Sequence, residues 1–307
     1  MIQHAGADVN SGCNKQILPV REESAMLIRM IDKERITILP VLVDSPAAWW
    51  YNNLVARIFR KGDPPMHCIL AVAMHKQADV PHNPPYLPVQ AGAALHPSLG
   101  VTGDHTGDNI STRNPLYSEL TAMYWLWKNA DADALGLCHY RRYFRGRQGG
   151  RLTQEQLETL LVDADVIVPA PRVYLIETNR SQYAHAHRAC DLDVTRQVMA
   201  ELHPAFLPDY DRVMKRVWGR RFNMCIMRRD WFDRYCSWLF SILAEVEARL
   251  PDMPERTLGH IAERLMDVWL LHEKPRMLDL PVLHTESQHW PVKIARFLMR
   301  KCTGGKK

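Results

Sequence analysis

The segment of residues 108–144 constrains the fold more than any other part of the sequence, because it predicts a helix that leads into a buried strand. Asn114 is placed to cap the helix, and Pro115 fits its first position, where a missing N–H costs nothing. Apolar residues then recur every three or four positions as far as Lys128, which predicts one buried helix face. The apolar run Ala134–Cys138 follows and is typical of a strand inside a sheet.

The predicted strand is followed at once by His139, Tyr140, Arg141 and Arg142. Ligands of open α/β sheets bind outside the carboxyl ends of the strands, which is where these side chains are expected. Guanidinium groups form paired hydrogen bonds with phosphate oxygens and also stack on aromatic rings. The cluster therefore predicts a site for a diphosphate joined to a planar base. The alternative is that the arginines are solvated and the rings pack in the core.

Four polar residues near the start of the predicted helix are further candidates for binding the same ligand. Tyr117 and Glu119 lie near its first turn, which is the electropositive end of a helix. Asp108 and Asn109 precede the helix and could hydrogen-bond a ribose or sugar hydroxyl. Asp and Asn are also ordinary turn residues, so a structural role is the alternative for this pair.

Strands and helices alternate through the middle of the chain. The run Cys68–Met74 predicts a central strand that delivers His75 and Lys76 to its end. Thr153 and Gln156 form a capping-box pattern at the start of another helix. Other predicted elements are strands at Val166–Pro171 and Asn223–Met227 and helices at Asp230–Leu250 and Thr257–His272. This order predicts an α/β protein with a helix-rich C-terminal half.

The composition is that of an ordinary globular protein, with 47% hydrophobic and 24% charged residues among 307. The seven cysteines are scattered and form no C-x-x-C pair, which argues against a disulfide framework and a structural zinc site and favours a reducing compartment. Met1–Asn14 lacks an apolar core and no apolar run reaches about 18 residues, so we expect neither a signal peptide nor a membrane-spanning helix. The net charge of +5 is compatible with an anionic substrate or membrane surface.

Several motifs of the chain occur together in one known group of proteins. They are Met74-His75-Lys76, Tyr86-Leu87-Pro88-Val89-Gln90-Ala91-Gly92-Ala93-Ala94, Asp108-Asn109-Ile110-Ser111, Glu119-Leu120-Thr121-Ala122 and His139-Tyr140-Arg141-Arg142-Tyr143-Phe144. With them the chain resembles the bacterial glycosyltransferases of capsule and O-antigen gene clusters that were long filed as a domain of unknown function. The resemblance covers residues 67–285. It implies a GT-A-like fold with a mixed central sheet and flanking helices, and a nucleotide-activated hexose as donor; some relatives resemble galactofuranosyltransferases.

The resemblance also suggests how the chain is divided. Residues 66–285 are predicted to form the glycosyltransferase domain, residues 1–65 a partly mobile extension, and residues 286–307 a basic amphipathic tail. In the tail, cations flank an apolar stripe over residues 290–301, as in helices that lie at membrane interfaces, and residues 47–61 are similar. Docking on an anionic membrane surface would bring the protein to a lipid-linked acceptor. The alternative is a tail helix packed on the domain.

A further question is whether a metal ion neutralises the leaving group, because GT-A enzymes commonly hold a divalent ion with an Asp-x-Asp string at a strand end. Three such strings occur, at Asp131/Asp133, Asp163/Asp165 and Asp191/Asp193. The first two precede their strands and are expected to form turns, while Asp193 fits a helix cap. We therefore expect no metal cofactor, and we expect the arginines, with Lys76, to stabilise the departing diphosphate. The alternative is a metal-dependent transferase that holds Mn²⁺ or Mg²⁺ at Asp191 and Asp193.

An inverting transferase also needs a base that deprotonates the acceptor hydroxyl as it attacks. The candidates are Asp191 and Glu263, followed by Glu119 and Glu177. For Glu263 the alternative is an ion pair with Arg264. We assign His185 and His187 to an acceptor groove, with plain surface exposure as the alternative.

The predicted function is transfer of a hexose, with galactofuranose among the candidates, from a UDP-sugar to a growing capsule, O-antigen or exopolysaccharide chain. The acceptor would be a lipid-linked or polymeric glycan, and the protein would act in the cytoplasm, with the inner face of the cytoplasmic membrane as a docking surface. An alternative of another class is a non-catalytic module that binds polysaccharide or membrane. Nucleic acid is not expected as a partner, because the aromatic residues follow helical spacing instead of alternating with basic residues on strands.

Overall fold

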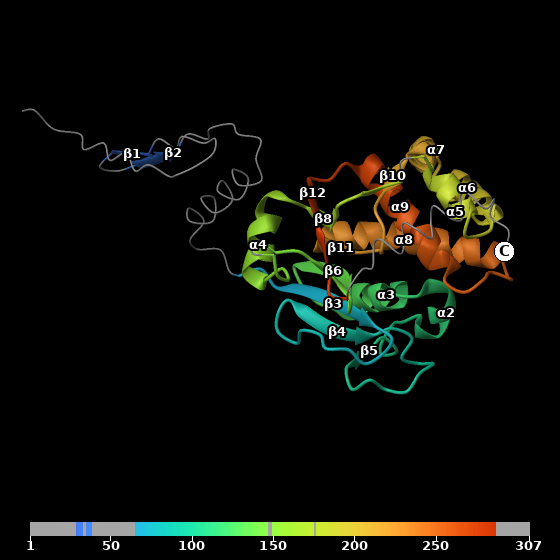
Figure 1. The fold of residues 1–307 in the computed structure, drawn as a ribbon, viewed down its shortest axis with the longest axis horizontal. Coiled ribbons are helices and arrows are strands. Elements are labelled where there is room, and N and C mark those ends of the chain that lie inside the picture. Colours follow the sequence, from blue (N-terminus) through green and yellow to red (C-terminus); the bar gives the residue numbers. More distant parts are fainter. Residues whose placement is uncertain (1–28, 33–34, 39–64, 147–148, 175, 287–307) are drawn as a thin grey trace, which may run out of the picture. The chain divides into compact units, whose positions relative to one another are not determined.

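The computed structural model describes residues 29–32, 35–38, 65–146, 149–174 and 176–286 (Figure 1). The chain forms two units, Met1–Asp63 and Pro64–Lys307. In the first unit, β1 (Arg29–Asp32) pairs with β2 (Arg35–Ile38) in antiparallel fashion. The predicted amphipathic segments 47–61 and 290–301 lie outside the described residues. All elements named below belong to the second unit.

A mixed sheet of nine strands forms the centre of this unit. The strands are β3 (Cys68–Met74), β4 (Tyr86–Gln90), β5 (Thr102–Gly103), β6 (Ala134–His139), β7 (Arg142–Phe144), β8 (Val166–Pro169), β11 (Cys225–Arg228), β12 (Met277–Leu280) and β13 (Val282–His284). The main path runs β12-β8-β11-β6-β3-β4-β5, and β7 pairs with β6 and β13. β6, β3, β4 and β5 are parallel, whereas β11 is antiparallel to both of its neighbours. A separate two-stranded ribbon consists of β9 (Arg172–Val173) and β10 (Trp218–Gly219).

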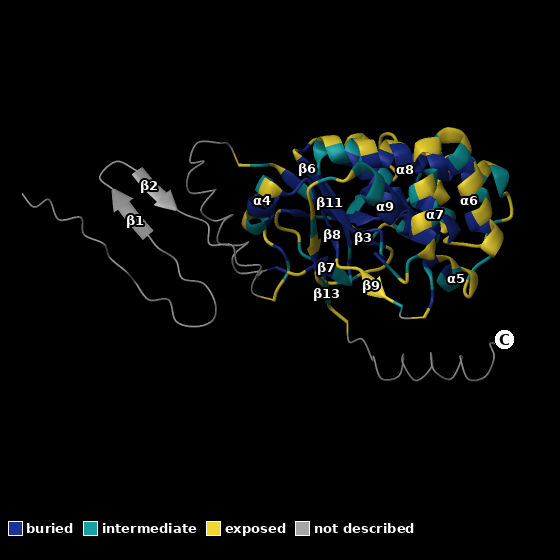
Figure 2. Ribbon diagram, turned by 90° about the horizontal axis from the view of Figure 1, so that it is seen from above, coloured by how far each residue is buried: buried dark blue, intermediate teal, exposed yellow. Residues whose placement is uncertain are grey.

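Helices flank the sheet and dominate the C-terminal half, so the predicted fold class is confirmed. They are α2 (Asn114–Tyr117), α3 (Leu120–Asn129), α4 (Gln154–Asp163), α5 (Asn179–Ala184), α6 (Ala189–Leu202), α7 (Leu207–Lys215), α8 (Arg229–Arg249) and α9 (Thr257–Glu273), with single 3₁₀ turns at Ser111–Arg113 and Pro204–Phe206. α3 contacts β3 and β6, and α8 contacts β6 and β11. Figure 2 shows buried residues on one side of α8 and exposed residues on the other.

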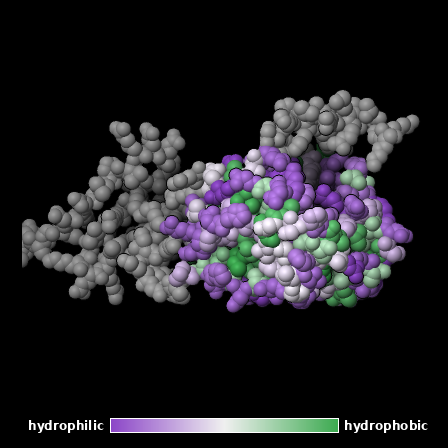
Figure 3. Space-filling model, turned by 90° about the horizontal axis from the view of Figure 1, so that it is seen from below, coloured by the Kyte–Doolittle hydropathy of each residue, from purple (hydrophilic) through white to green (hydrophobic). Residues whose placement is uncertain are grey.

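The centre of the sheet is closely packed around Gly136 in β6. A Cβ atom at this position would lie 2.6 Å from the carbonyl oxygen of Cys225 and 2.6 Å from Cδ1 of Leu70, so only glycine fits between β3 and β11. On the face of the molecule in Figure 3, hydrophobic residues form small groups separated by hydrophilic ones. Within the described ranges, no helix is long and apolar enough to cross a bilayer.

The single helix predicted from Pro115 to Lys128 is wrong, because the helix is broken at Ser118. Ser118 has φ 52°, a left-handed conformation that ends α2 and starts α3 in a new direction. Asn114 does not cap a continuous helix; its Nδ2 donates to the carbonyl oxygen of Ser118 at 2.8 Å and to Oγ1 of Thr121 at 3.1 Å, and so bridges the break. The break directs Tyr117 into the core, where it is 4% exposed.

The predicted capping box at the start of α4 is confirmed: Thr153 Oγ1 accepts from the backbone N–H of Gln156, and the Gln156 side chain accepts from the backbone N–H of Thr153. We expect Thr153→Ala to lower the free energy of unfolding by about 1 kcal/mol, because the first turn of α4 loses an acceptor. Thr153→Ser keeps the hydroxyl and is the matched control. Urea denaturation measures both; equal stability of the two variants would contradict a capping role.

Candidate active site

A cavity of about 560 Å³ lies at the carboxyl ends of β3 and β6, where the parallel register brings Ala73 beside His139. It brings together seven of the residues predicted from the sequence: His75, Glu119, His139, Tyr140, Arg141, Arg142 and Glu263. Its volume is in the range of pockets for small molecules. The structure therefore brings side chains that follow two separate strands together at this edge of the sheet.

Arg142 has the arrangement expected of an anion-binding side chain. Its guanidinium carbon lies 4.4 Å from the centroid of the Phe222 ring, so one face of the group is covered. Its Nε is buried and has no hydrogen-bond partner among the described residues. A guanidinium stacked through its face keeps its N–H donors in the plane of the group, where they can reach phosphate oxygens. Burial lowers the pKa of Arg142, and the positive charge of the neighbouring Arg141 lowers it further.

Arg141 and Lys76 flank the ring of Tyr140 at the edge of the cavity. The Arg141 guanidinium carbon lies 4.9 Å from the ring centroid and the Lys76 ammonium 5.6 Å from it. Arg141 also forms an ion pair with Glu286 at 3.0 Å, and its side chain is 37% exposed. Lys76 is next to the cavity without lining it. Arg141 therefore carries less uncompensated charge toward a ligand than Arg142 does.

Two of the histidines that line this cavity, His75 and His139, have pKa values below the ordinary value and are neutral near pH 7. Burial, and then the positive charges of Arg141 and Lys76, lower the pKa of His75. Burial also lowers the pKa of His139. His139 Nε2 lies 2.6 Å from the carbonyl oxygen of Phe222, which can only accept, so this nitrogen carries the ring proton. The fixed positive charge of the cavity therefore comes from the arginines.

Glu119 and Glu263 both hold the turn that carries Phe222. Phe222 and the next residue, Asn223, have φ values of 81° and 51°, which side-chain-bearing residues adopt only at an energetic cost. Glu263 Oε1 accepts from the backbone N–H of Phe222 at 2.9 Å, and Glu119 Oε1 accepts from Asn223 Nδ2 at 2.8 Å. Glu263 Oε2 also forms an ion pair with Arg264 at 3.2 Å, which is the alternative role named for this residue in the sequence analysis. Glu263 forms this ion pair and also lines the cavity.

Besides Lys76, three predicted donor-binding residues are not brought into the cavity. Tyr117 is buried and its hydroxyl donates to Glu247 Oε2 at 3.1 Å. Asp108 accepts from the hydroxyl of Tyr124 at 3.2 Å. The side-chain amide of Asn109 donates to the carbonyl oxygens of His105 and Gly107 within its own turn. These contacts are the structural roles that were the alternatives for Asp108 and Asn109.

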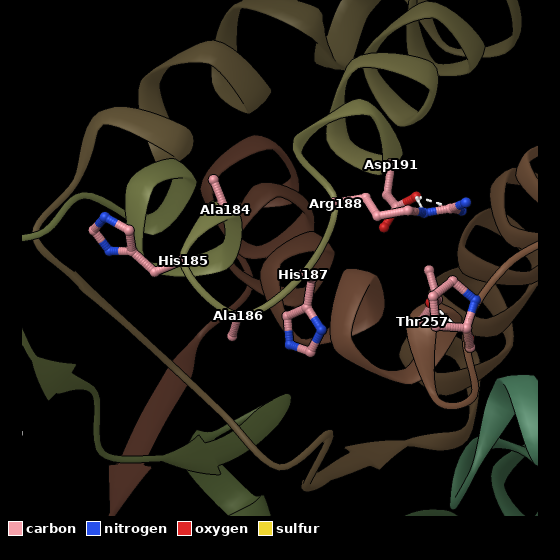
Figure 4. Close-up of a pocket in the computed structure, with 8 residues that line it drawn as sticks. Ala184, His185, Ala186, His187, Arg188, Asp191 and Thr257 are labelled. Carbon is pink, nitrogen blue, oxygen red and sulfur yellow. Dashed lines mark hydrogen bonds and ion pairs between the residues drawn. The ribbon is translucent and has the colours of Figure 1, made fainter. Parts of the chain in front are cut away.

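A second cavity of about 300 Å³ contains the predicted acceptor residues His185 and His187 (Figure 4). Arg188, Asp191, Pro254 and Thr257 also line it. His185 pairs with Glu177 at 2.9 Å, and burial, followed by the neighbouring His260, lowers the pKa of His187 to about 4. The structure therefore places both histidines on one cavity, just after α5 ends at Ala184.

The proposed base Asp191 has its carboxylate enclosed by protein. Its side chain accepts from the Tyr183 hydroxyl at 2.9 Å and from Arg188 Nε at 3.1 Å, and the residue is 0% exposed. Asp193 lies two positions further along α6 and pairs with Arg180 at 2.9 Å. Positions two apart on a helix do not face each other, so these carboxylates do not converge on one ion.

The predicted helix cap at Asp193 is wrong, because α6 starts at Ala189 with Arg188 as its N-cap. The other two Asp-x-Asp strings lie in helix-to-strand turns, as predicted. Asp133 accepts from the backbone N–H of His67 at 2.7 Å, and Asp165 pairs with Arg276 and Arg228.

Sequence reasoning missed several residues that line the larger cavity. Arg256 and His260 are among them, and His260 is three positions from Glu263 on α9, so the helical spacing could have revealed it. Arg256 precedes the helix with φ 66° and donates its backbone N–H to the carbonyl oxygen of Pro115 at 2.7 Å. No sequence signal marked Phe222, whose position depends on its left-handed turn.

Comparison with known proteins gives a family and a structural relative. The family described as "Domain of unknown function (DUF4422)" matches residues 69–274. A solved structure described as the apo form of the bifunctional glycosyltransferase WbbM is 25% identical in sequence, with a TM-score of 0.66. The similarity covers 72% of this chain and 45% of the WbbM chain, so the present chain spans less than half of that protein. No curated protein matches the chain.

Proposed function

The chain belongs to the DUF4422 family, and from this membership and the geometry of the larger cavity we propose that it is a glycosyltransferase. It moves a hexose from a UDP-sugar to a growing surface polysaccharide of the capsule, O-antigen or exopolysaccharide type. The observation that carries the proposal is Arg142, stacked on Phe222 with a buried, unpartnered Nε at the carboxyl ends of two parallel strands. The likeness to a glycosyltransferase structure supports the same class of reaction.

The donor occupies the larger cavity. Its diphosphate contacts Arg142, with Arg141 and Lys76 adding positive charge from the rim. The ring of Tyr140 contacts both of these cations and so holds their charge at the edge of the cavity. The reaction builds negative charge on the leaving diphosphate. Hydrogen-bond donors of the protein that are already fixed in place therefore stabilise the transition state more than they stabilise the bound substrate.

The acceptor enters through the smaller cavity, where His185 and His187 contact its hydroxyl groups. A nucleotide-sugar donor and the described cysteines, which are all free, suit the cytoplasm as the site of the reaction. We further propose an inverting reaction, in which the acceptor hydroxyl attacks the anomeric carbon directly. UDP-galactofuranose is one of the candidate donors.

The proposed enzyme needs no metal ion, because arginine side chains supply the charge that a divalent ion would otherwise provide. We expect treatment with EDTA to leave at least half of the transfer rate, and added Mn²⁺ or Mg²⁺ to change it by less than about threefold, which corresponds to under about 1 kcal/mol. The rate of UDP release, measured before and after treatment, is the readout. Complete loss that either ion restores would support the metal-dependent alternative instead.

The experiment that tests the function itself is a screen of UDP-hexoses, including UDP-galactofuranose, for ligand-induced thermal stabilisation and for UDP release. A ligand that binds only the folded state raises the unfolding midpoint in proportion to the logarithm of its concentration. We expect UDP and one UDP-hexose to stabilise the protein and that hexose to yield free UDP. Tight binding of polysaccharide with no response to any nucleotide sugar would instead favour the non-catalytic module.

A further inference from the structure

The larger and smaller cavities meet at a pair of stacked histidines. His260 lines the larger cavity and His187 lines the smaller one, and their ring centroids are 4.3 Å apart. The loop before α9 forms the rest of this boundary: Pro254 faces the smaller cavity, while Glu255 and Arg256 face the larger one. If donor and acceptor occupy the two cavities, as proposed above, the reacting atoms meet beside His260.

Two carboxylates near this boundary, those of Asp191 and Glu263, are engaged in holding the protein together. Asp191 is fully buried between Tyr183 and Arg188. Glu263 accepts from the backbone N–H of Phe222 and pairs with Arg264. A general base must be within hydrogen-bond reach of the proton it removes, and both carboxylate oxygens of Asp191, which lines the smaller cavity, already accept hydrogen bonds from Tyr183 and Arg188.

His260 has the properties that these carboxylates lack. Its backbone is fixed in the first turn of α9, because its N–H donates to the carbonyl oxygen of Arg256 at 3.0 Å and its own carbonyl accepts from Arg264 Nη1 at 2.7 Å. Its ring lines the cavity and forms no hydrogen bond to another described residue. A neutral imidazole has one nitrogen with a free lone pair, which can accept a proton.

Burial lowers the pKa of His260, and the charged groups that face it act in both directions. Arg264 and Arg256 oppose its protonation, whereas Glu263 and Glu119 favour it, and the neighbouring His187 is itself neutral because its pKa is about 4. The net direction is a pKa below 6.5, so His260 is unprotonated near neutral pH and loses its free lone pair as the pH falls through that pKa.

We propose that His260 is the catalytic base of the transfer reaction. Its unprotonated ring nitrogen takes the proton of the acceptor hydroxyl while the acceptor oxygen forms a bond to the anomeric carbon of the donor. The bond between that carbon and the diphosphate oxygen breaks, and its electron pair leaves with the nucleotide diphosphate. His187 is a positioning residue, because its ring stacks on His260 from the acceptor side. This inference rests on the proposed glycosyltransferase function.

The test compares His260→Gln with His203→Gln in the full-length protein. General bases typically contribute about 100-fold or more, so we expect His260→Gln to lower kcat by about that factor while the Kd for UDP changes less than twofold. His203 also has a pKa lowered by burial, but it bonds Ser241 and lines neither cavity, so His203→Gln should keep the wild-type rate. Free imidazole should restore activity to His260→Ala, which a purely structural role would not produce.

The pH profile of the wild-type protein gives a readout that needs no variant. Its kcat should fall as the pH is lowered below 6.5, and this acid limb should be absent in His260→Gln. An acid limb that persists unchanged in His260→Gln, or a His260→Gln variant that keeps full transfer, would overturn the assignment. In either case wild-type UDP release would still support the glycosyltransferase function, whereas no release from any donor would remove that function.

Discussion

Replacing Arg142 by alanine should lower kcat for transfer by about 100-fold or more. This is the usual effect of removing one fixed hydrogen-bond donor from a site where negative charge develops in the transition state. The side chain is stacked on Phe222, its Nε is buried without a partner, and it forms no ion pair with another of the described residues. The Kd for UDP should also weaken by about 10-fold, because a charge-assisted hydrogen bond typically contributes 1.5 kcal/mol or more. Steady-state kinetics and calorimetry measure the two quantities.

Two variants serve as controls for Arg142→Ala. Arg142→Lys keeps the charge but loses the planar group that stacks on Phe222, so we expect an intermediate rate. Arg141→Ala should have a smaller effect than Arg142→Ala, because Arg141 is 37% exposed and already paired with Glu286. If Arg141→Ala were the more damaging change, the diphosphate would have to lie at the rim of the cavity and the proposed donor position would be wrong.

The donor side of the site could be predicted because it depends on local sequence. Cys68–Met74 is a strand with the predicted bounds, and Ala134–His139 extends the predicted strand by one residue. Both are apolar runs buried on two faces, and their parallel pairing fixes which ends lie together. Once these strands are recognised, the positions of His75, His139 and the following arginines at one edge of the sheet follow from geometry alone.

Residues whose position depends on distant parts of the chain could not be placed in the same way. Tyr117 was assigned to the donor site because it lies in the first helical turn, but Ser118 breaks the helix and Tyr117 bonds Glu247, 130 positions later. The predicted strand over Asn223–Met227 begins two residues late, at Cys225, because Phe222 and Asn223 form a left-handed turn. Glu263 stabilises that turn from 41 residues away, a contact that no local pattern predicts.

The same turn depends on a buried ion pair that should dominate the stability of this part of the molecule. Arg220 lies two residues before Phe222, and Asp267 accepts from both its backbone N–H, at 2.8 Å, and its Nη1, at 2.7 Å. The side chains of Arg220 and Asp267 are 6% and 0% exposed. Removing one partner of a buried pair leaves the other charge uncompensated, which typically costs about 3–5 kcal/mol.

We therefore expect Asp267→Ala to lower the free energy of unfolding by about 3 kcal/mol, near the lower end of that range, because Asp279 also pairs with Arg220 at 2.8 Å and keeps part of the charge compensated. Asp279→Ala is the matched control: its carboxylate contacts the same guanidinium but is 37% exposed, so its loss should cost about 1 kcal/mol or less. Urea denaturation with an unchanged m-value measures both losses. Equal losses for the two variants would mean that burial of Asp267 does not set the strength of its ion pair with Arg220. The Phe222 turn would then be stabilised by its contacts with Glu263, His139 and Glu119 and not by that ion pair.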